Sequence, residues 1–175
     1  MKDILSRATQ VRCLICDVDG VLTDGRLYIN IHGEETKAFH VQDGLGLKLL
    51  MAAGIEVAVI TATTNTIIDS RMNSLGITHY FKGQIDKQTA FLALQTRLKL
   101  DLHAFAYIGD DLPDMPLIQQ VGLGIAVANA VDEVKHVAHW QTKHKGGKGA
   151  VREACDFILK SQGQFDIALQ RYLAP

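Results

Sequence analysis

The chain alternates short apolar runs with segments in which apolar residues recur at helical spacing. The apolar runs have the length of strands and are continuous enough to be buried on both faces. They cover Val11 to Cys16, Ile55 to Ile60, Phe105 to Ile108 and Leu123 to Ala128. This alternation of strands and helices favours an α/β fold with a doubly wound, mostly parallel sheet and right-handed crossovers.

Residues that prefer helix ends divide the remaining sequence. A helix that opens at Asp43-Gly44 ends at Gly54, another ends at Gly76, and Lys87 begins a third. Further helices are expected over 115–121, 130–138, 151–159 and 165–173, and a short strand over 80–83. Neither an internal repeat nor a low-complexity linker interrupts the sequence, so residues 1–175 are expected to form one domain.

A β-hairpin is expected between the first strand and the first helix. Residues 26–31 and 36–41 are strand-like, and they flank His32-Gly33-Glu34-Glu35, which has the composition of a turn. We expect this hairpin to project from the sheet.

Composition excludes several classes of protein. The net charge is −1 with no long basic run, so nucleic acid is not an expected partner. No apolar stretch approaches the roughly 20 residues that span a bilayer, and residues 1–10 lack the apolar core of a signal peptide. We therefore expect a cytoplasmic protein with no membrane partner. Cys13, Cys16 and Cys155 lie in apolar contexts and are expected to be reduced core thiols, because strand residues three apart face opposite sides.

Acidic residues follow the first buried strand. Asp17 and Asp19 are separated by one residue, so on an extended chain they point the same way and need a cation between them. Oxygen ligands of this kind suit Mg²⁺. The sequence Asp17-Val-Asp19-Gly20 is also common in turns, so the motif alone leaves both interpretations open.

Other strands of the predicted sheet end in polar residues as well. Thr61 ends the second strand, Asp110, Asp111 and Asp114 follow the third, and Lys87 begins a helix. The carboxyl ends of parallel strands meet at one edge of a sheet, where ligands bind. Together these groups suit a phosphate ester, with a carboxylate nucleophile, an acid, a cation site and a lysine that offsets negative charge.

These segments resemble a known superfamily. The stretch Asp17-Val-Asp19-Gly-Val-Leu-Thr-Asp-Gly, the strand ending at Thr61, Lys87, and Gly109-Asp110-Asp111-x-x-Asp114 resemble motifs I to IV of the haloacid dehalogenase superfamily. The segments Phe39-His-Val-Gln-Asp43-Gly44 and Gly146-Gly-Lys-Gly-Ala-Val-Arg152-Glu, with the short length, resemble the 3-deoxy-D-manno-octulosonate 8-phosphate (KDO 8-P) phosphatases.

The resemblance implies a role for each motif residue. Asp17 would be the nucleophile and a Mg²⁺ ligand, Asp19 the general acid and base that binds the metal through its carbonyl, and Asp110 the third protein ligand. Thr61 and Lys87 would hold phosphate, Asp111 would support the metal shell, and Asp114 would be a supporting residue at the edge of the site. Candidate substrate contacts are Asp24, Phe39, Asp43, Gly44, Arg71, Lys148 and Arg152.

The chain has no room for a cap domain. Enzymes of the superfamily usually carry a cap after motif I or motif II, but residues 24–56 hold only the hairpin and a helix, and residues 62–86 only a helix and a short strand. In the resembled family the hairpin assembles a tetramer, and a glycine-rich tail closes a neighbour's site. The resemblance therefore implies a homo-oligomer, specifically a tetramer, in which residues 146–149 form a mobile segment.

Two positions depart from the family pattern. Thr61-Ala62-Thr63 stands where Thr-Gly-Arg is usual, which removes a charge near the expected substrate. Lys148 stands where arginine is frequent, so a point charge replaces a bidentate fork.

The expected activity is Mg²⁺-dependent hydrolysis of a small sugar-acid phosphate, KDO 8-P, in lipopolysaccharide precursor synthesis. Alternatives are a phosphatase of a nine-carbon nonulosonic acid 9-phosphate, a broad sugar phosphatase, or a phosphoprotein phosphatase with an open site. A non-catalytic oligomeric domain is the rival from another class, but it would be expected to lose one of the clustered charges, which cost stability.

Overall fold

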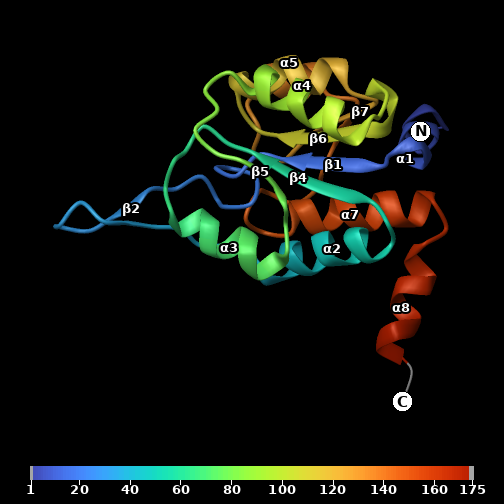
Figure 1. The fold of residues 1–175 in the computed structure, drawn as a ribbon, viewed down its shortest axis with the longest axis horizontal. Coiled ribbons are helices and arrows are strands. Elements are labelled where there is room, and N and C mark those ends of the chain that lie inside the picture. Colours follow the sequence, from blue (N-terminus) through green and yellow to red (C-terminus); the bar gives the residue numbers. More distant parts are fainter. Residues whose placement is uncertain (1, 174–175) are drawn as a thin grey trace.

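The computed structural model describes residues 2–173, and its centre is a six-stranded sheet (Figure 1). The strands lie in the order β5-β4-β1-β6-β7-β8, and every pair in this sheet is parallel. Their bounds are β1 Cys13–Cys16, β4 Glu56–Ile60, β5 His79–Phe81, β6 Phe105–Gly109, β7 Leu123–Ala126 and β8 Trp140–Gln141. The doubly wound parallel sheet expected from the sequence is confirmed.

Helices cover both faces of the sheet. Their bounds are α1 Lys2–Gln10, α2 Val41–Ala52, α3 Ile67–Leu75, α4 Lys87–Leu98, α5 Met115–Gln120, α6 Asp132–Val137, α7 Ala150–Ser161 and α8 Phe165–Leu173, with short 3-10 helices at Leu102–Ala104 and Leu112–Asp114. Helices α2, α3 and α7 lie on one face and α4 and α5 on the other, while α8 extends away from the sheet (Figure 1). Helix α1, strand β8 and the two 3-10 helices were not expected from the sequence.

The order of the strands fixes where a site can form. β1 is central and fully buried, with β4 on one side and β6 on the other. The chain fills the β4 side first and then crosses to the β6 side, so the connections diverge around β1. In open α/β sheets, ligands bind beyond the carboxyl ends of the strands at such a point.

The hairpin between β1 and α2 is shorter than the sequence pattern predicted. It consists of β2 Tyr28–Ile29 and β3 Glu35–Thr36, which pair antiparallel and project from the sheet (Figure 1). The prediction of a strand over 36–41 is wrong in extent, because α2 begins at Val41. An isolated ribbon that leaves Leu27, Ile29 and Ile31 exposed buries too little apolar surface to sustain long strands.

The three cysteines are buried and unpaired, as expected of reduced core thiols. Among residues 2–173, no helix has both the length and the apolar character needed to cross a bilayer.

Candidate active site

A cleft of about 280 Å³ opens at the carboxyl ends of the central strands. Asp17 follows β1, Thr61 follows β4, Asp110 follows β6, and Lys87 is the first residue of α4. The cleft is lined by Asp17, Asp19, Gly25, Thr61, Ala62, Thr63, Lys87, Asp110, Asp111, Pro113 and Asp114. The structure thus brings together all the motif residues that the sequence analysis selected.

Three carboxylates meet at the floor of this cleft. Asp17, Asp110 and Asp114 each place an oxygen within 4.8 Å of the others. Burial, and the neighbouring carboxylates after it, raise the pKa of Asp17 to about 7 and that of Asp110 to about 8. Asp110 Oδ1 is buried and has no hydrogen-bond partner among the described residues. An unpartnered buried oxygen beside other carboxylates fits a hard divalent cation such as Mg²⁺.

Lys87 supplies the positive charge at the floor of the cleft. Its Nζ lies 2.8 Å from Asp17 Oδ1 and 2.6 Å from Asp114 Oδ1, and the side chain is 5% exposed. Burial lowers the pKa of Lys87, but the two carboxylates outweigh it, so the pKa is raised and the ammonium stays charged.

Asp114 lies deeper than an edge position and organises the loop that carries Asp110. It accepts the hydroxyl hydrogen of Tyr107 at 2.6 Å and the backbone N–H groups of Asp110 at 2.9 Å and Asp111 at 3.3 Å. Burial raises the pKa of the fully buried Tyr107, so its hydroxyl remains a donor. Asp111 caps the following 3-10 helix by accepting from Leu112 N at 2.8 Å.

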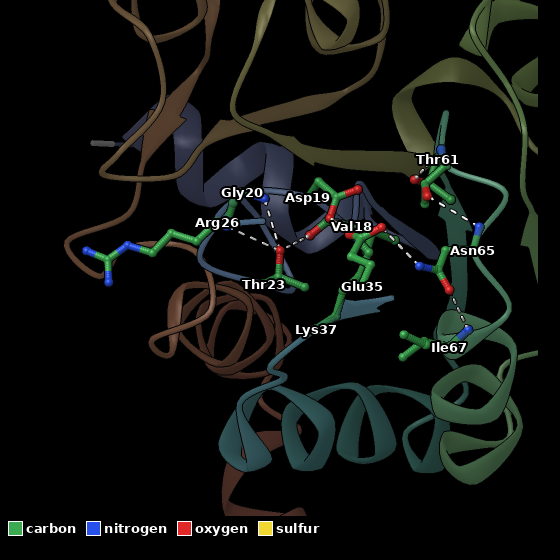
Figure 2. Close-up of polar contacts among 12 residues, drawn as sticks. Val18, Asp19, Gly20, Thr23, Arg26, Glu35, Lys37, Thr61, Asn65 and Ile67 are labelled. Atoms are coloured by element: carbon green, nitrogen blue, oxygen red, sulfur yellow. Dashed lines mark hydrogen bonds and ion pairs between the residues drawn. The ribbon is translucent and has the colours of Figure 1, made fainter. Parts of the chain in front are cut away.

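Asp19 is held by a lysine that sequence reasoning missed. Lys37 Nζ lies 2.5 Å from Asp19 Oδ1 and 2.7 Å from Glu35 Oε1, and its side chain is only 2% exposed. Glu35 in turn accepts from Asn65 Nδ2 at 3.0 Å (Figure 2). Glu35 and Lys37 are two apart on an extended segment, so their side chains share a side, which is the only sequence signal for the pair.

Thr61 and Thr63 form the wall of the cleft beside β4. Thr61 is buried, and its hydroxyl accepts from Thr63 N at 3.3 Å. Thr63 Oγ1 accepts from Asn65 N at 3.4 Å. Thr63, which stands where the resembled family pattern has arginine, therefore has a short side chain that is hydrogen-bonded within a local turn.

None of the seven candidate substrate contacts lines this cleft in its own chain. Asp43 is buried and accepts from Arg152 N at 2.8 Å and Gly149 N at 3.4 Å, which ties α2 to the start of α7. The Arg71 guanidinium lies 5.7 Å from the centre of the Phe39 ring. An added Cβ at Gly44 would overlap this guanidinium, so Gly44 allows the close approach.

The remaining candidates also face other partners. Asp24 accepts from Arg26 N at 3.1 Å and from the Tyr28 hydroxyl at 3.2 Å, at the base of the hairpin. Arg152 donates to Asp156 Oδ1 at 2.7 Å and lines a second hollow, of about 390 Å³, between α2, α7 and β8. Lys148 lies in the turn before α7, where its N–H donates to Lys145 O at 3.1 Å.

Comparison with known proteins gives the same assignment as the geometry. Residues 55–154 match the haloacid dehalogenase-like hydrolase family. The KDO 8-P phosphatase of Yersinia pestis is 48% identical over 164 residues, covering 94% of this chain and 88% of that protein, and the one of Escherichia coli K12 is 45% identical over 95% and 88%.

A solved structure agrees along nearly the whole chain. The KDO 8-P phosphatase of Moraxella catarrhalis, in complex with magnesium, phosphate and KDO, has a TM-score of 0.95 and 44% identity, covering 98% of this chain and 99% of that one. The chain belongs to the haloacid dehalogenase-like hydrolases and, within them, to the family of the KDO 8-P phosphatases.

Proposed function

We propose that the chain is a Mg²⁺-dependent phosphatase that hydrolyses KDO 8-P to KDO and phosphate. The observation that carries this proposal is the arrangement of Asp17, Asp110 and Asp114 around the ammonium of Lys87 at the strand ends. The relative from Moraxella catarrhalis, whose structure holds magnesium, phosphate and KDO, supports the choice of metal and substrate.

Asp17 and Asp19 divide the chemistry between them. Asp17 attacks phosphorus, so a bond forms from its carboxylate oxygen to phosphorus while the bond from phosphorus to the sugar oxygen breaks. Asp19 in its protonated form gives its proton to that sugar oxygen, and KDO leaves as the alcohol. Asp19 then takes a proton from water as the water attacks phosphorus, which releases phosphate and restores the Asp17 carboxylate.

The other residues bind and orient the phosphoryl group. Lys87 would offset charge on the phosphoryl oxygens, and the Thr61 hydroxyl would donate to one of them. Asp17, the Asp19 carbonyl and Asp110 would hold Mg²⁺, with Asp111 supporting its shell. The ion, when bound, would neutralise oxygen charge as a Lewis acid. Asp114 would act on the site by fixing Lys87 and the Asp110 loop.

A homotetramer is part of the proposal. The hairpin exposes 61% of Ile29, 67% of Leu27 and 95% of Ile31, an apolar surface that a second copy could cover. Lys148 and Arg152 do not line the cleft of their own chain, so substrate contacts from them would come from a neighbouring subunit. Asp24, Phe39, Asp43, Gly44 and Arg71 are proposed to shape the substrate region.

The whole chain, residues 1–175, is proposed to act as one domain in the cytoplasm. The unpaired cysteines fit a reducing compartment.

A nine-carbon ulosonic acid 9-phosphate, or a wider range of sugar phosphates, is the second candidate substrate class. Ala62 and Thr63 line the cleft where the family usually has glycine and arginine, so a charge expected to select the substrate is missing.

The test is Mg²⁺-dependent phosphate release from eight-carbon and nine-carbon ulosonic acid phosphates, hexose phosphates and a phosphopeptide. Selectivity for the eight-carbon acid would support the proposal. Preference for the nine-carbon acid, or weak activity on every ester, would leave only the reaction class.

A further inference from the structure

A lysine with a buried side chain, Lys37, links Asp19, the proposed general acid and base, to the hairpin. Lys37 follows β3, and its Nζ contacts Asp19 Oδ1 and Glu35 Oε1 at the same time (Figure 2). Asp19 keeps 40% of its side chain exposed toward the cleft, whereas the Lys37 side chain is 2% exposed. Lys37 therefore has almost no surface with which to contact a substrate.

The contacts continue from Glu35 to the start of α3. Glu35 Oε2 accepts from Asn65 Nδ2 at 3.0 Å, and Asn65 Oδ1 accepts from Ile67 N, the first residue of α3, at 3.0 Å. Figure 2 shows this series running from Asp19 through Lys37 and Glu35 to Asn65. The position of Asp19 is thus set by the hairpin and, through Glu35 and Asn65, by the start of α3.

The charges explain why Lys37 matters for orientation. Asp19 and Glu35 are both carboxylates, and one ammonium lies between them. If that ammonium is removed, the two carboxylates repel, Asp19 loses a charge-assisted hydrogen bond, and Glu35 loses an ion pair. Asp19 is the exposed partner, so it is free to rotate away. Lys37 contacts only Oδ1, and no hydrogen bond within residues 2–173 engages Oδ2, which leaves Oδ2 available for proton transfer.

We propose that Lys37 is a positioning residue that holds Asp19 in the orientation from which it protonates the leaving oxygen. The inference rests on the proposed function, because it takes Asp19 as the acid. It predicts that the loss of Lys37 lowers kcat/KM more for esters whose leaving group must be protonated than for esters whose leaving group need not be.

The test compares two leaving groups in one variant. The Lys37→Met enzyme would be measured by kcat/KM with the best alkyl phosphate ester of the substrate panel and with 4-nitrophenyl phosphate, whose leaving group needs little protonation. General acid catalysis contributes on the order of 10²-fold or more. We expect a loss of about 10²-fold with the alkyl ester and less than about 3-fold with the aryl ester. An equal loss with both esters, or no loss, would overturn the inference.

Three further variants separate positioning from folding. Lys37→Met in an Asp19→Asn background should change kcat/KM by less than about 2-fold, because residues that act as a unit are non-additive. Glu35→Gln removes only the charge that Lys37 pairs with on the hairpin. It should also lower kcat/KM more for the alkyl ester than for the aryl ester, but by less than Lys37→Met does. Lys135→Met removes a lysine that pairs with Asp132 at 3.2 Å on α6 and should change neither ester.

Failure of the inference is distinguishable from failure of the proposed function. A wild-type enzyme that hydrolyses no phosphate ester would overturn both. An active wild-type enzyme with additive Lys37→Met and Asp19→Asn effects would overturn the inference alone. Circular dichroism of each variant would show that it folds, and Glu35→Gln would serve as the test if Lys37→Met does not.

Discussion

Gly20 offers a test of the metal site through a residue that carries no charge. Its φ is +87°, a left-handed conformation that favours glycine, and an added Cβ would overlap Asp110 Oδ2 and lie 2.5 Å from Asp110 Cγ. Gly20→Ala should therefore push the Asp110 carboxylate out of the cluster. Gly76, the C-cap of α3, has a φ of +77° with no atom within 4 Å of its Cβ position, so Gly76→Ala is the matched control.

The two substitutions should lower the free energy of unfolding by the same backbone effect, but only Gly20→Ala should weaken the binding of Mg²⁺. A left-handed alanine costs about 1–2 kcal/mol, of which the lower freedom of the unfolded chain offsets about 0.4–1 kcal/mol. Both variants should lose about 1 kcal/mol of unfolding free energy without metal. Displacing a group that orients a metal site typically weakens binding by about 10–100-fold, and only Gly20→Ala should show this.

The assay is urea unfolding of each protein with and without Mg²⁺. At a concentration of about 100 times the wild-type dissociation constant, the ion should stabilise wild type and Gly76→Ala by about 2.7 kcal/mol. Affinity that is weaker by about 10–100-fold would reduce this gain to about 1.4–0.4 kcal/mol in Gly20→Ala. Equal stabilisation of both variants by Mg²⁺ would refute the placement of Asp110 in the metal site.

Three other substitutions test separate parts of the structure. Asp17→Asn should abolish turnover and leave the circular dichroism spectrum unchanged, and retained hydrolysis would contradict a covalent intermediate. Tyr107→Phe removes a 2.6 Å donor from buried Asp114 and should cost about 1–3 kcal/mol in urea unfolding; an unchanged midpoint would mean that the hydroxyl contributes nothing. Burial raises the pKa of Glu153, but hydrogen bonds from His144 outweigh it, so the folded-state pKa lies below the ordinary 4.5. This contribution to stability is present above pH 4.5 and is lost as the pH falls through the folded pKa, so acid should reduce the difference between wild type and Glu153→Gln in unfolding experiments. A difference that persists in acid would argue against it.

The fold was predictable where burial alone decides it. β1 and β6 are fully buried, so their continuous apolar runs identify them. The start of α4 was predicted at Lys87, where the structure has it, and the structure shows Asp86 as its N-cap, accepting from Gln88 N. β8 was missed because its two residues pair with β7 only at an edge, and a two-residue strand carries no periodicity. α1 was missed because polar residues dominate its sequence.

The site was predictable as far as topology could place it. Each motif residue follows a strand or begins a helix, and the parallel sheet brings such positions to one edge. The side-chain partners depend instead on loop geometry. Lys37 reaches Asp19 through the path of the chain just after β3, and Asp114 receives the Tyr107 hydroxyl because the 3-10 helix after Asp111 turns it inward.

The structure separates the acidic residues into two groups with different compensating charges. Asp19 and Glu35 share Lys37, a cation that belongs to the chain and remains in place. Asp17 and Asp114 share Lys87, and Asp110 lies beside them, so the cluster carries two excess negative charges when all three carboxylates are ionised. Burial and the neighbouring carboxylates raise the pKa of Asp17 and Asp110, and a divalent cation would supply the charge that balances them. The carboxylate of the proposed nucleophile thus sits in the group whose excess charge a metal would balance, whereas the carboxylate of the proposed acid is paired with Lys37.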